Sequence, residues 1–208
     1  MTRNPVAEDT SLSNLMVVLR ESQETCRTEA TLVDMGPATG TWPDGTEFEI
    51  HQAWFEFIGD MHIRFVFDSP RCMHGLTIEE FAAFHLSPEE AVRVAIANMR
   101  RLHGVPQVSP WSKGVMLVYG KSPDFDSSYF LDEDFWQELL KQHPEGLVAA
   151  VPKRGGLLFV PVTDEPAVLH LRKGIHTLFT TSEQMRVSSG LYLYKDSHWS
   201  VFQAPVGT

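Results

Sequence analysis

Cysteine is scarce in this chain of 208 residues, and the scarcity argues against a fold held by disulfides. Only Cys26 and Cys72 are present, whereas small secreted domains usually carry several pairs. We therefore expect a reducing compartment, with one disulfide between these two residues left open. At 43% hydrophobic residues, the chain can bury a large core without a metal or a disulfide.

Basic residues are also few relative to acidic ones. Lys and Arg total 17 against 27 Asp and Glu, which gives a formal charge of -10. This charge repels nucleic-acid phosphates and anionic lipid headgroups over about a Debye length. We therefore expect no nucleic-acid and no membrane partner, while a basic protein partner or a local basic patch stays open.

Long apolar runs and a secretory leader are missing from the sequence. The opening residues, MTRNPVAEDTSLSN, lack a basic start, an apolar stretch and a small-residue cleavage site. No segment approaches the run of about 18 apolar residues that a membrane helix needs. These features predict a cytoplasmic protein.

The segments rich in strand-forming residues occur mostly in pairs. Residues 46–58 and 61–68 flank Gly59-Asp60, which predicts a two-residue hairpin that places Trp54 opposite Phe65. Two further hairpins are predicted by the same reasoning, from 147–151 with 157–162 and from 191–194 with 199–202. A single buried strand is predicted at 115–119.

Helical patterns separate these pairs. Ser87, Pro88 and Glu90 form a capping box before a helix that runs to about residue 102. Other helices are predicted at 12–19 (with a strand at 16–19 as the alternative), 78–84, 131–142 and 165–179, the last capped by Asp164. Hairpins interrupted by isolated helices indicate an α+β fold with a largely antiparallel sheet and about four helices. The best boundary is at 69–77, between a β-rich subdomain (1–75) and an α+β domain (76–208).

Three segments carry a resemblance to a known family. They are ANMRRL at 97–102, DFDSSYFL at 124–131 and GLVAAVP at 146–152. With these segments, residues 87–208 resemble the YtpQ-like family of uncharacterised bacterial proteins, a domain of unknown function. The resemblance implies no activity, substrate, cofactor or catalytic residue.

The densest acidic stretch contains Asp124, Asp126 and Tyr129. Its alternating oxygens suggest a calcium loop, but Tyr129 and Phe135 stand where such a loop needs Gly and a bidentate Glu. The favoured interpretation is a loop shaped by the two aspartates, followed by acidic residues 132–134 in the first turn of a helix.

The sequence contains no recognisable zinc-binding motif and no recognisable nucleophile motif. Cys72, His74, His85 and His62 show no paired zinc-ligand spacing. There is no G-x-S-x-G elbow, and neither cysteine lies in a known catalytic signature. We therefore predict no metal, no cofactor and no identifiable catalytic residue.

One loop is both basic and glycine-bearing. Backbone N–H groups around Lys153 and Arg154, followed by Gly155 and Gly156, are able to hold an anion. The favoured interpretation is a hairpin turn, since the loop opens no predicted helix.

Two tryptophans, Trp42 and Trp111, fall in predicted loops that contain proline. Aromatic side chains in such places anchor protein partners or cover the edge of a core. Both residues are therefore candidate binding residues.

Two functions remain. The favoured one is a non-enzymatic binding or adaptor protein with a basic protein partner, for example an immunity-type protein that neutralises a basic nuclease toxin. The alternative is a small-molecule enzyme whose site lies where the loop at 124–129 meets the loop at 152–154.

Overall fold

The computed structural model describes residues 9–22, 26–69 and 72–206, and within them the chain is an α+β protein built on antiparallel sheets. The first sheet has the order β1-β6-β5-β2, with β7 also paired to β6. Its strands are β1 (Leu15–Glu21), β2 (Val33–Asp34), β5 (Trp54–Glu56), β6 (Met61–Asp68) and β7 (Met73–Gly75). The fold class expected from the sequence is confirmed.

The second sheet has the order β13-β12-β10-β11-β9-β8, and every pairing in it is antiparallel. Its strands are β8 (Gln107–Ser112), β9 (Val115–Tyr119), β10 (Leu147–Lys153), β11 (Gly156–Pro161), β12 (Leu191–Lys195) and β13 (His198–Gln203). The hairpins β10–β11 and β12–β13 confirm the two predicted from the sequence.

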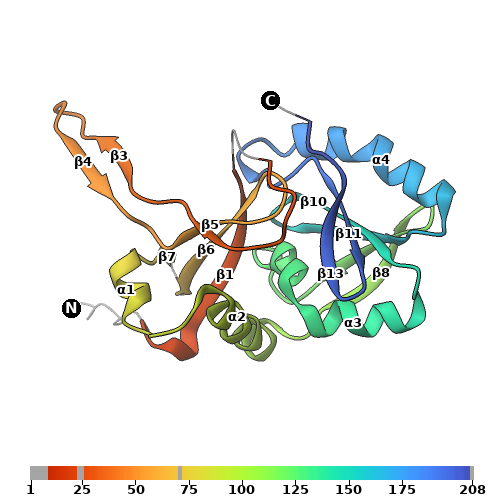
Figure 1. Cartoon of the computed structure of the whole chain (residues 1–208), viewed down its shortest axis with the longest axis horizontal. Helices are drawn as coiled ribbons and strands as arrows, with labels where there is room; N and C mark the ends of the chain where they lie inside the picture. The colour runs from red at the N-terminus through yellow and green to blue at the C-terminus, as the bar shows by residue number, and fades with distance from the viewer. Residues whose placement is uncertain (1–8, 23–25, 70–71, 207–208) are drawn as a thin grey trace, which may run out of the picture.

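A separate hairpin, β3 (Ala38–Thr41) with β4 (Glu47–Ile50), extends away from the body of the molecule (Figure 1). The α-helices are α1 (Ile78–Ala82), α2 (Pro88–His103), α3 (Glu133–Gln142) and α4 (Glu165–Thr180). Short 3-10 helices are η1 (Leu12–Asn14), η2 (Asp126–Leu131) and η3 (Glu183–Met185). The capping box of Ser87 and Glu90 and the cap by Asp164 are both formed, as predicted.

Residues 12–19 form η1 and β1, so the predicted helix is wrong and the alternative strand is correct. Residues 15–19 are all fully buried, because β1 is covered on both faces. A strand buried on both faces lacks the alternation of apolar and polar residues that identifies a half-exposed strand.

The hairpin at 46–68 also differs from its prediction. Residues 47–50 pair with β3, so of the predicted strand at 46–58 only the part in β5 pairs with β6. The Phe57 amide donates to the Met61 carbonyl at 2.8 Å, so the loop has three residues instead of two. The register therefore moves by one residue, and Trp54 lies opposite Arg64 instead of Phe65.

One hydrophobic core contains buried residues of both sheets and of α2. It includes Leu19 and Phe65 of the first sheet, Met99 of α2, and Ala149 and Tyr192 of the second sheet. A smaller cluster lies under α4, on the other face of β10 and β11. The division of the chain at 69–77 stays a prediction.

Candidate functional site: a groove between α2, α3 and the β12–β13 turn

A cavity of about 570 Å³ opens between α2, the start of α3, the β12–β13 turn and the segment around Ala30 and Leu32. This size is within the range of ligand sites, about 300–1,000 Å³. We call it the groove. Its apolar lining includes Phe57, Ile96 and Trp199.

Helix α2 contributes a full stripe to the groove. Val92, Ile96 and Arg100 recur at intervals of four residues and therefore lie on one face. Ala95 and Met99 belong to a neighbouring face, are fully buried and join the core beneath the helix. The helix thus contacts the core with one face and lines the groove with another.

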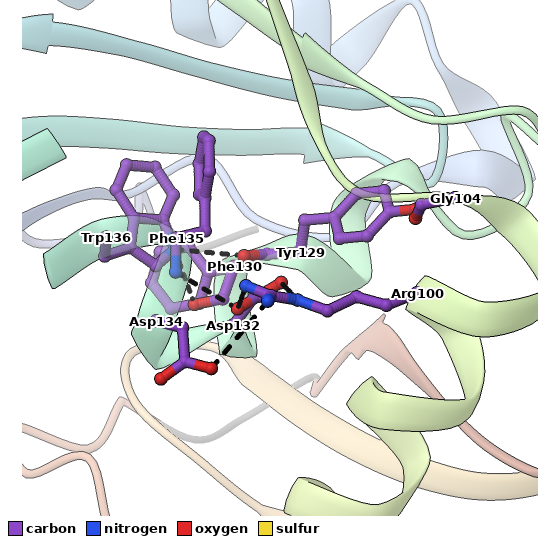
Figure 2. Close-up of polar contacts among 8 residues, drawn as sticks. All are labelled: Arg100, Gly104, Tyr129, Phe130, Asp132, Asp134, Phe135 and Trp136. Atoms are coloured by element: carbon purple, nitrogen blue, oxygen red, sulfur yellow. Dashed lines mark hydrogen bonds and ion pairs between the residues drawn. The ribbon is translucent and has the colours of Figure 1, made fainter. Parts of the chain in front are cut away.

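An ion pair between Arg100 and Asp132 joins α2 to α3 at the groove wall (Figure 2). Arg100 Nε donates to Asp132 Oδ2 at 2.7 Å, and a terminal guanidinium nitrogen donates to Oδ1 at 2.5 Å. The Asp132 side chain is 1% exposed and that of Arg100 29%. Asp134 lies 3.7 Å from the same guanidinium.

Asp132 also interacts with the backbone of α3, because its Oδ1 accepts a hydrogen bond from the Phe135 amide at 3.2 Å. That bond caps α3. The pKa of Arg100 is raised, mainly by its hydrogen bond to Asp132 and also by the charges of Asp132 and Asp134. The pair fixes the distance between the two helices that form the groove.

Aromatic packing holds the floor of the groove rigid. Trp136 donates to the carbonyls of Tyr129 and Phe130 (Figure 2). Phe130 stacks on Trp199 with ring centroids 4.0 Å apart. Trp199 is therefore fixed in orientation where it lines the groove.

The rim of the groove is mainly acidic. Glu89, Glu133 and Asp134 are exposed carboxylates, and Arg93 is the exposed guanidinium among the lining residues. Glu89 lies in the first turn of α2 and Glu133 in that of α3. The capping signals of both helices thus place carboxylates at the entrance.

Tyr194 also lines the groove, and its buried hydroxyl has Gln137 and Ser197 as polar neighbours but forms no hydrogen bond of normal geometry within the described residues. The pKa of Tyr194 is raised by burial and by the charge of Glu133, while Gln137 and Ser197 offset part of the rise. A buried hydroxyl that lacks a well-formed hydrogen bond is unfavourable. It offers a hydrogen bond to a group that enters the groove.

The two candidate tryptophans lie outside the groove and far from each other. Trp42 is in the turn of the β3–β4 hairpin, 55% exposed, with its ring 4.6 Å from that of Phe48. Trp111 is 45% exposed and lies in β8, so its predicted loop position is wrong. β8 is an edge strand and tolerates Pro110 for that reason. The β3–β4 hairpin and β8, which carry the two tryptophans, lie at opposite ends of the molecule (Figure 1).

The loops at 124–129 and 152–154 meet directly. The Ser127 amide donates to the Arg154 carbonyl at 3.0 Å. Lys153 pairs with Gly156 across the β10–β11 turn, which confirms the hairpin interpretation of this loop. Lys153 and Asp124 are exposed, and Arg154 is half-buried.

Asp126 and Tyr129 are buried by contrast. Asp126 accepts a hydrogen bond from the Gly120 amide at 2.7 Å, and burial raises its pKa. Tyr129 donates to the Gly104 carbonyl at 2.6 Å (Figure 2), and burial raises its pKa to about 12. Both side chains hold the polypeptide around η2, so Asp126 shapes its loop as the sequence analysis expected.

The groove was not predictable from the sequence because its parts are distant in the chain. The one available signal was the second stripe on the helix from Pro88, where Val92 and Ile96 precede Arg100. Nothing in the sequence links Arg100 to Asp132 across 32 positions.

Within 9–22, 26–69 and 72–206, no group of three or more His, Cys, Asp or Glu side chains is placed to hold a metal ion. Among the zinc ligands considered from sequence, His62 accepts a hydrogen bond from Arg64, and His74 lies 3.9 Å from Glu80. No disulfide joins Cys26 and Cys72.

The chain matches no protein-family model, no curated protein and no solved structure. The resemblance to the YtpQ-like family stays a prediction. None of the helices in the described part of the chain is long and apolar enough to cross a membrane.

Proposed function

We propose that this chain is a non-enzymatic binding protein that receives a basic segment of a protein partner in the groove. The observation that carries the proposal is an apolar cavity of about 570 Å³ with an acidic rim. The expected occupant is a peptide segment with one or two Lys or Arg residues next to a large apolar residue. An immunity-type interaction with a basic toxin is one form of this function.

Charge complementarity supports a basic occupant. The exposed carboxylates Glu89, Glu133 and Asp134 outnumber the exposed guanidinium of Arg93 among the lining residues, within a chain of formal charge -10. An apolar side chain suits the floor formed by Ile96 and Trp199. Complementary charges at a rim accelerate association and make it sensitive to salt.

We favour binding over catalysis because the charged side chains that converge near the two loops are mostly guanidinium groups. The enzyme hypothesis requires a nucleophile or a base near Arg154. The charged groups that shift the pKa of Arg20 beside this turn are Arg64, Arg154 and Asp124, and Asp124 is exposed. Guanidinium groups remain protonated at neutral pH and do not act as bases.

The test uses a fluorescent synthetic peptide with alternating Lys and Leu residues and a control peptide with Glu in place of Lys. We expect the Lys peptide to bind, and the double variant Glu133→Gln/Asp134→Asn to bind it about tenfold more weakly. Glu138→Gln is the matched control, since Glu138 is an exposed carboxylate on the same helix that pairs with Lys141.

Fluorescence anisotropy at two salt concentrations measures the affinities. Equal affinity for the Lys and Glu peptides contradicts the proposal. So does equal weakening by Glu138→Gln and by the double variant.

A further inference from the structure

A second cluster of charged side chains lies on one face of the first sheet, away from the groove lining. Arg20 of β1 is paired with His62 of β6, and Arg64 of β6 is paired with Trp54 of β5. Residues that are paired across strands, and residues two apart on a strand, share a face of the sheet. Arg20, His62, Arg64 and Trp54 therefore lie together.

Arg154 joins this cluster from the β10–β11 turn. Lys153, next to Arg154, forms a β-bridge with Arg186, and Arg186 lies 3.4 Å from Glu21 at the end of β1, so this turn lies beside the strand that carries Arg20. The charge of Arg154 accordingly lowers the pKa of both Arg20 and Arg64. We call Arg20, Arg64 and Arg154 the arginine cluster. Each of the three is half-buried, so each is partly desolvated and still accessible.

The arginine cluster lacks carboxylate partners. The ion pairs formed by arginines in the described ranges involve Arg27, Arg100 and Arg186, and none involves these three. Asp124 is the one carboxylate that raises the pKa of Arg20, and it is the weakest of the four influences on that residue. Partly buried charges are normally paired, so three neighbouring cations without an anion are unusual.

Most of the N–H donors in the cluster also lack protein acceptors. Arg20 donates to the Leu19 carbonyl at 2.7 Å, and Arg154 donates to the Gln184 carbonyl at 3.3 Å. Arg64 donates from Nε to His62 Nε2 at 2.8 Å. A guanidinium has five N–H donors, and the buried Nε of Arg154 has no partner among the described residues.

Trp54 and His62 fix the direction of Arg64. The guanidinium carbon of Arg64 lies 3.8 Å from the centroid of the Trp54 ring. Because Arg64 Nε is a donor, His62 Nε2 must be the acceptor, which requires a neutral imidazole. Burial and the charges of Arg64 and Arg20 lower the pKa of His62 to about 3, in agreement with this geometry. The guanidinium of Arg64 is thus held in place before any ligand arrives.

We propose that the arginine cluster is a binding site for a phosphate group, free or carried by a small phosphate monoester. Guanidinium groups bind phosphate through pairs of parallel hydrogen bonds. A dianion between three cations removes their mutual repulsion and supplies acceptors to the open donors. The site is separate from the groove, and the proposal does not depend on the function proposed for the groove.

Calorimetric titration with sodium phosphate and with O-phosphoserine tests the site, in a buffer free of other multivalent anions and at constant ionic strength. The wild-type protein is expected to bind one or both saturably. Tighter binding of O-phosphoserine indicates a monoester as the ligand, and tighter binding of inorganic phosphate indicates the free ion. Either result supports the site, and no saturable binding of either ligand contradicts it.

Variants locate the site. Arg20→Gln and Arg64→Gln are expected to bind about tenfold or more weakly, because each removes charged hydrogen bonds. Arg172→Gln is the matched control, since Arg172 is exposed on α4 and stacks on Phe202. Equal weakening by Arg172→Gln and Arg64→Gln contradicts the proposal.

Circular dichroism checks that each variant is folded. Arg154→Gln keeps the test decisive if the strand variants unfold, because Arg154 lies in a turn and, within the described ranges, its side chain bonds only the Gln184 carbonyl. Unchanged phosphate affinity in folded Arg154→Gln then contradicts the proposal.

Discussion

Replacing Asp132 with alanine is expected to destabilise the protein by about 3–4 kcal/mol. Breaking a buried ion pair costs about 3–5 kcal/mol, and the lower end applies because Arg100 is 29% exposed and recruits water. Loss of the α3 cap adds about 1 kcal/mol. Asp132→Asn retains the cap to Phe135 and loses the charge, so it is expected to be intermediate.

Urea unfolding followed by circular dichroism gives the free energy of unfolding of each variant. A double-mutant cycle with Arg100→Met isolates the interaction between the two side chains. The reasoning is refuted if Asp132→Ala and Asp132→Asn both unfold within about 0.5 kcal/mol of wild type, the range of ordinary surface substitutions. Glu138→Gln on the same helix provides that surface reference.

Two further predictions concern the first sheet. The pKa of His62 is lowered to about 3 from its ordinary value near 6.5, so His62 favours folding above pH 6.5 and this contribution falls as the pH approaches 3. Wild type is expected to lose up to about 3 kcal/mol between pH 6.5 and pH 4 through this residue. His62→Gln is expected to show a flatter dependence of unfolding free energy on pH, and equal slopes would refute the assignment. Gly59→Ala is expected to cost more than about 2 kcal/mol, because Gly59 has φ +63° and an added Cβ collides with the Tyr192 ring. Gly36→Ala is its control, with φ +73° and open space, and is expected to cost about 1 kcal/mol; equal melting temperatures for the two variants would contradict the packing argument.

Local signals account for the elements that the sequence predicted. Ser87 and Asp164 are caps whose partners lie three residues away, and the turn at Asp196-Ser197 closes a hairpin of adjacent strands. Such interactions are formed within a short segment, so they can be recognised from the order of the residues in the sequence. The helices from Ser87 onward and the hairpins β10–β11 and β12–β13 were predictable for this reason, whereas β8 and its hairpin with β9 were missed.

Long-range pairing accounts for what the sequence did not predict. β1 pairs with β6 across 40 to 52 positions, and its burial on both faces conceals the strand pattern. The arginine cluster arises from that pairing and from the turn at Arg154. The groove likewise combines α2 with Trp199, near the other end of the sequence. Sequence periodicity carries no information on which distant segments meet.

The most direct test of the proposed binding function is to map where the Lys–Leu peptide binds. Backbone amide chemical shifts of the ¹⁵N-labelled protein, recorded during titration, report the location residue by residue. We predict shifts that concentrate at residues 92–100, 131–134 and 197–199, which line the groove. Shifts that concentrate on the β3–β4 hairpin or on β8, or no saturable shifts at all, would contradict the account.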